Sequence, residues 1–252
     1  EFPATPIWFI NSDEEIGSPE SQRFVRMISR AAARAFILEP GLGTDGKLKT
    51  ARKGVGRFRI LIHGEAAHSG LDPTSGASAI QELANVVHQL HSLTNLERGI
   101  TVNVGVVQGG TRVNVKAAEA EAEVDVRVAS MDDGEAVTRA IRGLIPRTPG
   151  TSLEVLGGIQ APPLERTPRN RKLWEAALAA GSRLGIKLEE GTSGGASDGN
   201  TTSQYAATLD GLGSVGDGAH ALHEHVVAKA LPSRSALLAE LLLSPVSSGD
   251  EW

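Results

Sequence analysis

The middle of the chain constrains the fold most, because strand and helix patterns follow one another there in a fixed order. Strands are predicted where apolar and polar residues alternate, and helices where apolar residues recur every three or four positions. In chain order these are a strand at 57–63, a helix at 77–93, strands at 100–107 and 119–129, a helix at 133–145 and a strand at 152–157. The order βαββαβ predicts a two-layer ferredoxin-like unit, which we place at residues 55–160.

The sequence on either side of this unit has a different pattern. In chain order it predicts a strand at 6–12, a helix at 18–32 with Ser18 as candidate N-cap, a strand at 35–40 and, after the proline-rich segment 161–168, helices at 170–185 and 231–245. Strands that alternate with helices are typical of α/β domains. We therefore predict an α/β domain formed by residues 1–54 and 161–252 and interrupted by the ferredoxin-like unit.

Composition excludes several classes of protein. A net charge of −5 with no basic block and 4% aromatic residues argues against a nucleic-acid partner. The absence of cysteine excludes disulfides and thiolate metal sites, so any metal must be held by His, Asp or Glu. No apolar run approaches the roughly 20 residues that span a bilayer. No signal-peptide pattern is visible either, so we expect a cytoplasmic protein without a membrane partner.

Acidic side chains follow two of the predicted strands. Glu14 and Glu15 come just after the strand at 6–12, and Glu39 closes the strand at 35–40. In open parallel sheets, ligands bind outside the carboxyl ends of the strands, so these carboxylates are candidates for a site. The alternative is an acidic turn that only faces water.

Histidines and glycines gather in the last quarter of the chain. The segment 218–226 (GAHALHEHV) holds three histidines and is open to two interpretations, a metal site or a polar surface loop. The pattern G-x-G-x-x-G at 211–216 lacks the helix that a dinucleotide site needs, so we interpret it as a flexible loop near a site. The glycine-rich turn 192–199 around Asp198 allows close approach of a ligand or serves as a tight connection.

Two polar residues of the ferredoxin-like unit carry less information on their own. His68 lies in a loop of small residues, where a lone histidine has no special meaning. Arg127 lies on the polar face of the strand at 119–129, where pairing with nearby acidic residues of that face (Glu121, Glu123 or Asp125) is the simpler explanation.

Taken in order, seven short motifs of this chain resemble those of one enzyme family. They are SDEEIGS, LEP, GEAAHSG, GGTRVNV, VDVRV, SGGASDG and GDGAHALHE. The family is that of the metal-dependent exopeptidases and deacylases that includes glutamate carboxypeptidase, aminoacylase and succinyl-diaminopimelate desuccinylase. The segment TARKG and the spacing from Glu39 to Lys47 are most similar to the glutamate carboxypeptidase branch. The resemblance implies a phosphorylase/hydrolase-like α/β catalytic domain with an inserted ferredoxin-like lid and dimerisation domain.

The resemblance also implies a role for each matching residue. Glu14 resembles the general base, and Glu15, Glu39 and His220 resemble ligands of two zinc ions. His68 resembles a lid histidine that reaches the active site of the other subunit and stabilises the oxyanion. The substrate-binding set implied by the resemblance consists of Asn114 and Arg127, which match residues that hold a substrate carboxylate, and Lys47, which assists them.

One departure from the family pattern matters. The family's upstream His-x-Asp motif and bridging aspartate are not in this sequence, so the resemblance implies that the N-terminal third is missing and that the catalytic domain is incomplete. Catalytic zinc sites normally have three protein ligands, so we expect full zinc occupancy to fail and activity to be weak or absent. We also expect this chain to form a homodimer through the lid domain or to pair with another chain.

The leading hypothesis is a zinc-dependent metallopeptidase or amidohydrolase. It would release a C-terminal, glutamate-like amino acid from a peptide, or deacylate an N-acyl amino acid. The first alternative is a non-catalytic binding or dimerisation module that has lost the metal centre. A second alternative, a ferredoxin-like domain that senses a small molecule, explains residues 56–158 but leaves the carboxylates and His220 unexplained.

Overall fold

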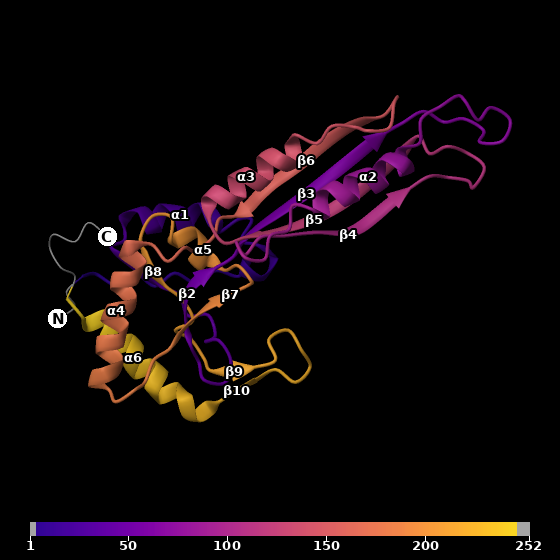
Figure 1. Cartoon of the computed structure of the whole chain (residues 1–252). Helices are drawn as coiled ribbons and strands as arrows, with labels where there is room; N and C mark the ends of the chain where they lie inside the picture. The colour runs from indigo at the N-terminus through magenta and orange to yellow at the C-terminus, as the bar shows by residue number, and fades with distance from the viewer. Residues whose placement is uncertain (1–3, 246–252) are drawn as a thin grey trace. The chain divides into compact units, whose positions relative to one another are not determined.

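The computed structural model describes residues 4–245, which belong to two compact units (Figure 1). Unit 1 is formed by Glu1–Lys53 and Pro163–Trp252, and unit 2 by Gly54–Pro162. Unit 2 is thus inserted into unit 1, between two segments that are far apart in the sequence. The fold is a mixed α/β domain that carries an inserted ferredoxin-like domain, as the sequence predicted.

Unit 2 has the predicted βαββαβ order. Its elements are β3 (Gly54–His63), α2 (Ala79–His91), β4 (Thr101–Gly109), β5 (Glu119–Val128), α3 (Met131–Arg142) and β6 (Ser152–Ala161). The strands form one sheet in the order β4-β5-β3-β6, and every neighbouring pair is antiparallel. This is the strand order of the split βαβ plan, which brings the first and third strands of the unit together in the centre.

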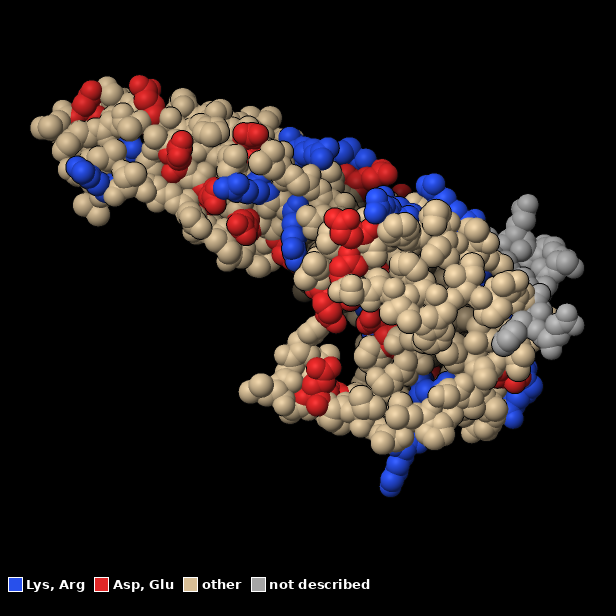
Figure 2. Space-filling model, turned by 180° about the vertical axis from the view of Figure 1, so that it is seen from behind, with Lys and Arg blue, Asp and Glu red and all other residues tan. Residues whose placement is uncertain are grey.

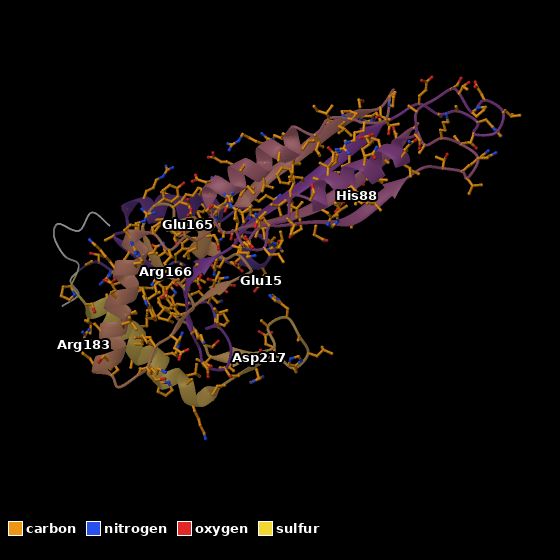
Figure 3. The ribbon with its side chains drawn as sticks, in the orientation of Figure 1. Glu15, His88, Glu165, Arg166, Arg183 and Asp217 are labelled. Carbon is orange, nitrogen blue, oxygen red and sulfur yellow. The ribbon has the colours of Figure 1, made fainter. Side chains whose placement is uncertain are left out.

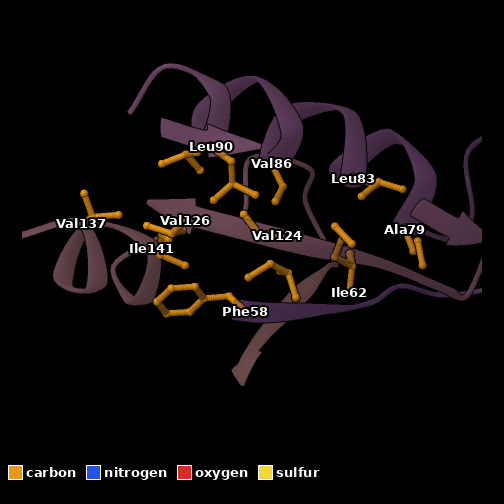
Figure 4. Close-up of a cluster of buried hydrophobic side chains, with 14 of the residues drawn as sticks. Phe58, Ile62, Ala79, Leu83, Val86, Leu90, Val124, Val126, Val137 and Ile141 are labelled. Carbon is orange, nitrogen blue, oxygen red and sulfur yellow. The ribbon is translucent and has the colours of Figure 1, made fainter. Parts of the chain in front are cut away.

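The core of unit 2 lies between the sheet and its two helices (Figure 4). Alternation places Phe58, Ile60 and Ile62 of β3 on the covered face, while Arg57 and Arg59 face outward. The helices meet this face with buried apolar side chains at helical spacing, which are Leu83, Val86 and Leu90 from α2 and Val137 and Ile141 from α3. Each such side chain contributes about 1.5–3 kcal/mol on burial.

A buried carboxylate ties one loop of unit 2 to α2. The Glu82 side chain, which is fully buried, accepts hydrogen bonds from the backbone N–H groups of Arg147 and Thr148 and from the Asn85 amide. Backbone N–H donors stabilise a buried carboxylate without a cation. The connection between α3 and β6 is therefore fixed against α2 rather than free.

Unit 1 is built from short strands and four helices in the described part of the chain. Its elements are η1 (Glu14–Ile16), α1 (Gln22–Ala31), β1 (Arg34–Phe36), β2 (Leu48–Arg52), α4 (Pro168–Arg183), β7 (Glu190–Ser193), α5 (Asp198–Thr202), β8 (Ala207–Leu209), β9 (Gly216–Asp217), β10 (His225–Val226), η2 (Ala228–Ala230) and α6 (Leu231–Leu243). β1 pairs with β8 and β2 with β7, both in parallel, and β9 pairs with β10 in antiparallel. The core packs Leu48 and Leu209 against Trp174 of α4 and Leu237 and Leu241 of α6.

The strand predicted for residues 6–12 is wrong. This segment forms no ladder with any strand of the described part, and Trp8 and Ile10 are 70% and 78% exposed. An apolar run becomes a strand only where a neighbour accepts its backbone hydrogen bonds, and residues 4–245 offer this segment no such neighbour. The predicted N-cap is wrong too: α1 begins at Gln22, and Ser18 instead adopts a positive φ of 54°.

Charged side chains are mixed over the surface. Figure 2 shows Lys and Arg interspersed with Asp and Glu on the face in view, with no continuous basic area. Of the described helices, none has both the length and the hydropathy that crossing a membrane requires.

Candidate functional site

Glu14 and Glu15 lie on a single 3₁₀ turn, η1, rather than on an extended segment. Gly17, at a φ of 92°, ends the turn, and its N–H donates to the Glu14 carbonyl at 2.8 Å. Three residues complete a 3₁₀ turn, so neighbouring side chains point about 120° apart. Glu14 is accordingly half-buried, whereas Glu15 is exposed (Figure 3). The two carboxylates therefore face different surroundings although they are adjacent in sequence.

Asp198 holds this turn against α5. Its Oδ2 accepts a hydrogen bond from Asn11 Nδ2 at 2.7 Å, and its Oδ1 accepts one from Ser18 Oγ, also at 2.7 Å. Asn11 and Ser18 lie before and after η1 in the sequence, so the Asp198 carboxylate binds the chain at both ends of the turn. The glycine-rich pattern around Asp198 does not indicate this role, because the two partners lie 187 and 180 residues away in the sequence.

The environment of Glu14 raises the pKa of its carboxyl from 4.5 to about 7. Burial is the largest cause, followed by repulsion from Glu39, Asp198 and Glu15, while Arg52 opposes the shift. Loss of hydration and nearby like charges both disfavour the ionised form. In the ion-free chain this carboxyl therefore titrates near neutral pH.

Arg52 connects Glu39 to the interior of unit 1. Its Nε and Nη2 donate to both oxygens of Asp210 at 2.7 and 3.0 Å, and Nη1 donates to the carbonyls of Gly195 and Ala196 at 3.1 and 3.3 Å. The remaining Nη2 hydrogen reaches Glu39 Oε2 at 3.3 Å. A guanidinium has five N–H donors, and these contacts use all of them. Arg52 thus fixes one oxygen of Glu39 to the end of β8 and to the glycine-rich loop.

The G-x-G-x-x-G segment packs its backbone closely against the segment that carries Glu39. Gly213 donates its N–H to the Glu39 carbonyl at 2.9 Å, and a Cβ at Gly213 would lie only 2.1 Å from the Leu38 carbonyl oxygen. Gly211 adopts a φ of 78°, which only glycine reaches without strain. The glycines therefore bring the chain close to the segment that carries Glu39, and no nucleotide is needed to explain them.

His220 lies in the loop between β9 and β10 with a positive φ of 64°. Its Nε2 is 3.9 Å from Glu15 Oε2, and both side chains are about four-fifths exposed. The tertiary structure therefore brings together two candidate ligands that are 205 positions apart in sequence. The neighbouring His225 instead donates from Nδ1 to the His223 carbonyl at 3.2 Å.

The candidate ligands are of the residue types that bind zinc, but there are too few of them among the described residues to complete a catalytic site. Zinc binds His nitrogen and carboxylate oxygen, and a catalytic site normally has three protein ligands. Glu15 and His220 supply two ligands that lie close together, and Glu39 supplies one further carboxylate near Glu14. Within residues 4–245 no group of three His, Asp or Glu side chains is arranged to hold a metal ion. The described residues therefore do not complete a zinc site.

The other candidate residues have local partners. Lys47 forms an ion pair with Glu189 at 2.9 Å. In unit 2, Arg127 pairs with Asp125 of its own strand at 2.9 Å, and Asn114 Nδ2 lies 3.2 Å from His68 Nε2. His88 of α2 (Figure 3) is exposed. Thus the side chain of His68 contacts that of Asn114, whereas Arg127 and Lys47 each form an ion pair with an acidic side chain.

Comparisons with known proteins find similarity to peptidases. Residues 50–150 match the M20 family described as a peptidase dimerisation domain. Carboxypeptidase G2 of Pseudomonas sp. (strain RS-16) is 28% identical over 245 residues, which cover 92% of this chain and 57% of that protein. A peptidase M20 domain-containing protein of Schizosaccharomyces pombe is 42% identical over 94 residues, covering 35% of this chain and 23% of that protein. The chain thus spans little more than half the length of carboxypeptidase G2.

Solved structures share the fold. The aminopeptidase PepT of Bacillus cereus superposes with a TM-score of 0.75 at 20% identity, over 90% of this chain and 61% of that one. The Bacillus subtilis YXEP protein, described as a dinuclear metal-binding peptidase of the M20 family, superposes with a TM-score of 0.67 at 19% identity, over 91% of this chain and 62% of that one. At this level of identity the similarity establishes the architecture alone.

Proposed function

We propose that this chain is part of a metal-dependent amide hydrolase, because residues 50–150 match a peptidase dimerisation domain and carboxypeptidase G2 is 28% identical over 245 residues. The hydrolase releases a C-terminal, glutamate-like amino acid from a peptide or removes the acyl group of an N-acyl amino acid. The observation that carries the proposal is the convergence of Glu14, Glu15, Glu39 and His220 from three distant segments of unit 1.

Each of these side chains takes one role in the proposal. Glu15 and His220 would hold one zinc ion, and Glu39 would be a ligand of the second. Glu14 stands beside them and would accept the proton of the attacking water. Two bound zinc ions would supply a polarised water and a positive charge beside the substrate carbonyl. The described residues provide fewer ligands than two zinc ions require. Both ions would therefore bind only when other residues supply the remaining ligands.

The substrate side of the proposal involves unit 2. Arg127 offers a guanidinium fork, which recognises a carboxylate through two hydrogen bonds. In the present structure Asp125 occupies that fork, so a substrate carboxylate has to replace it. Asn114, His68 and Lys47 complete the proposed binding set, and unit 2 forms the interface of a homodimer.

Hydrolysis and metal content measured together test the proposal. N-acyl amino acids and glutamyl-terminated peptides are incubated with this chain and with a form extended upstream, and bound zinc is measured by mass spectrometry. Glu14→Gln should lower the rate in the active form by about 10²–10⁴-fold, the contribution of a positioned general base. Glu20→Gln is the matched control, because Glu20 is an exposed acid of the same loop.

The alternative function is a binding or dimerisation module without catalysis. It is favoured by the incomplete metal ligands among the described residues. Zinc-free protein and no hydrolysis in either form would favour the module, whereas activity that resists Glu14→Gln would refute the role given to that residue.

A further inference from the structure

The sheet of unit 2 has one open face. Both helices pack against the other face, where Phe58, Ile60 and Ile62 of β3 are buried. The open face carries the intervening charged residues of the two central strands, which are Arg57 and Arg59 of β3 and Glu121, Glu123, Asp125 and Arg127 of β5. Their side chains are half-buried or exposed, so within unit 2 this face remains accessible to a ligand.

A hollow of about 440 Å³ lies in this face and is lined by residues of all four strands. Gly105 and Gly157 both line it, and neither has a side chain that could fill it. Gly105 lies at a bulge of β4, where the register shifts between Val104 and Val106. Gly157 of β6 adopts a φ of 96°, and a Cβ there would lie 2.2 Å from the Arg57 carbonyl oxygen. The two glycines thus keep the hollow open, and its volume lies within the range of about 300–1,000 Å³ that is usual for small-molecule sites.

One cation and one anion of the hollow have no protein partner. Two ion pairs occupy the other charged side chains of this face, namely Arg59–Glu121 and Arg127–Asp125. Arg57 and Glu123 are the exceptions, because neither side chain forms a hydrogen bond or an ion pair with any residue from 4 to 245. Both are exposed, and both line the hollow. Each can therefore bind an opposite charge without breaking an existing contact.

The register of the strands places Arg57 and Glu123 near each other. Arg57 is opposite Asp125 and Glu123 is opposite Arg59, so the two unpaired residues are diagonal neighbours on adjacent strands. Diagonal neighbours on one face of a sheet are about 7–8 Å apart. A small molecule that carries both a carboxylate and an ammonium group can therefore contact both side chains at once.

Apolar side chains complete the lining of the hollow. Val106 of β4 and Leu156 of β6 are 44% and 41% exposed, and both line it. The charges of the lining are balanced, since it contains two arginines and two carboxylates. A ligand with a single charge would be repelled by one pair while it is attracted by the other. A zwitterion with an apolar group instead matches the cation, the anion and the apolar wall together.

We propose that this hollow binds a zwitterionic amino acid with an apolar side chain. The Arg57 guanidinium donates to the carboxylate of the ligand, and Glu123 accepts from its ammonium group. The side chain of the ligand packs against Val106 and Leu156. None of these residues belongs to the set proposed for hydrolysis, so the inference does not rest on the proposed function.

Titration of the whole chain with leucine tests the proposal, by calorimetry for the affinity and by amide NMR shifts for the place of binding. We expect saturable binding, with shifts at the residues that line the hollow. N-Acetylleucine lacks the ammonium group and leucinamide lacks the carboxylate. Each should bind at least about tenfold more weakly than leucine, because each loses one charge-assisted hydrogen bond. Equal affinity for the three compounds, or no saturable shift around the hollow, would overturn the proposal.

Two charge variants assign each end of the ligand to its partner. Arg57→Gln should weaken leucine binding about tenfold but leave leucinamide unaffected, since leucinamide has no carboxylate to lose. Glu123→Gln should weaken leucine binding but leave N-acetylleucine unaffected. Arg139→Gln is the matched control, because Arg139 is an exposed arginine of α3 that does not line the hollow. If Arg57→Gln and Arg139→Gln bind leucine equally well, the proposed contact is wrong.

A third variant fills the hollow without changing a charge. At Gly105 the nearest atom to an added Cβ, Asn103 Nδ2, is 3.5 Å away, so β4 should accept Gly105→Val. This variant should abolish leucine binding while its thermal unfolding, followed by circular dichroism, stays like that of the wild type. Leucine that binds Gly105→Val normally would be bound elsewhere on the chain and would refute the site. These measurements need neither zinc nor turnover, so their failure would leave the proposed hydrolase untouched.

Discussion

Replacing Arg52 with methionine removes the guanidinium that pairs with Asp210 in the interior of unit 1. The Arg52 and Asp210 side chains are only 3% and 0% exposed. Removing one partner of a buried ion pair typically costs about 3–5 kcal/mol, because the other charge remains buried and uncompensated. The Ser197 hydroxyl still donates to Asp210 at 2.7 Å, and Lys49 still attracts it, so we expect the lower end, about 3 kcal/mol.

Tryptophan fluorescence during urea unfolding measures this loss. All three tryptophans of the sequence fall in unit 1, and Trp174 is buried in its core. With a urea dependence of about 1–3 kcal/mol per molar, a loss of this size lowers the midpoint by roughly 1–3 M. The double variant Arg52→Met/Asp210→Leu removes both charges and should recover most of the stability, since an apolar pair can replace a buried ion pair.

The surface pair between Arg183 of α4 (Figure 3) and Glu240 of α6 provides the control. Its atoms lie 2.6 Å apart, but the side chains are 53% and 31% exposed. Arg183→Met should therefore cost less than about 1 kcal/mol. If Arg52→Met costs no more than Arg183→Met, or if the double variant is less stable than Arg52→Met alone, then the buried pair does not stabilise unit 1 as argued.

Three further outcomes are expected. Burial raises the pKa of Glu82, but the loop N–H groups lower it below 4.5, so its stabilisation is present above pH 4.5 and is lost as the pH falls through the folded value. Glu82→Gln should cost about 1–3 kcal/mol at neutral pH, with a difference from wild type that shrinks below pH 4.5 in urea titrations followed by circular dichroism. Gly213→Ala should displace the segment that carries Glu39 and weaken zinc retention in equilibrium dialysis of an extended form. Gly194→Ala is the control and should lack this defect, because Gly194 has no positive φ and no atom lies within 4 Å of the added carbon. Asp198→Ala removes the hydrogen bonds to Asn11 and Ser18 and should raise amide hydrogen exchange at residues 11–18. Unchanged exchange there would show that Asp198 does not hold the η1 turn in place.

Unit 2 was predictable because its signals are local. Alternation over 57–63 and 119–129 and helical spacing over 77–93 identify each element without reference to the others, and only one familiar plan has the order βαββαβ. The strand at 6–12 fails because the same apolar run needs a neighbouring strand, which sequence pattern alone cannot supply. Similarly, Ser18 looks like an N-cap locally, but its hydroxyl donates to Asp198, 180 residues away.

The candidate ligands and the candidate general base were predicted from the order of the motifs, which indicates residues but not their geometry. The sequence by itself determined the residue types available for chemistry, namely carboxylates and histidines without cysteine, and it determined the insertion of unit 2. The tertiary structure decided which of them meet: His220 with Glu15, Glu39 with Arg52, and His68 with Asn114. The physical reason is that periodicity reports burial within one element, whereas hydrogen bonds and charge interactions depend on distances between segments far apart in the chain.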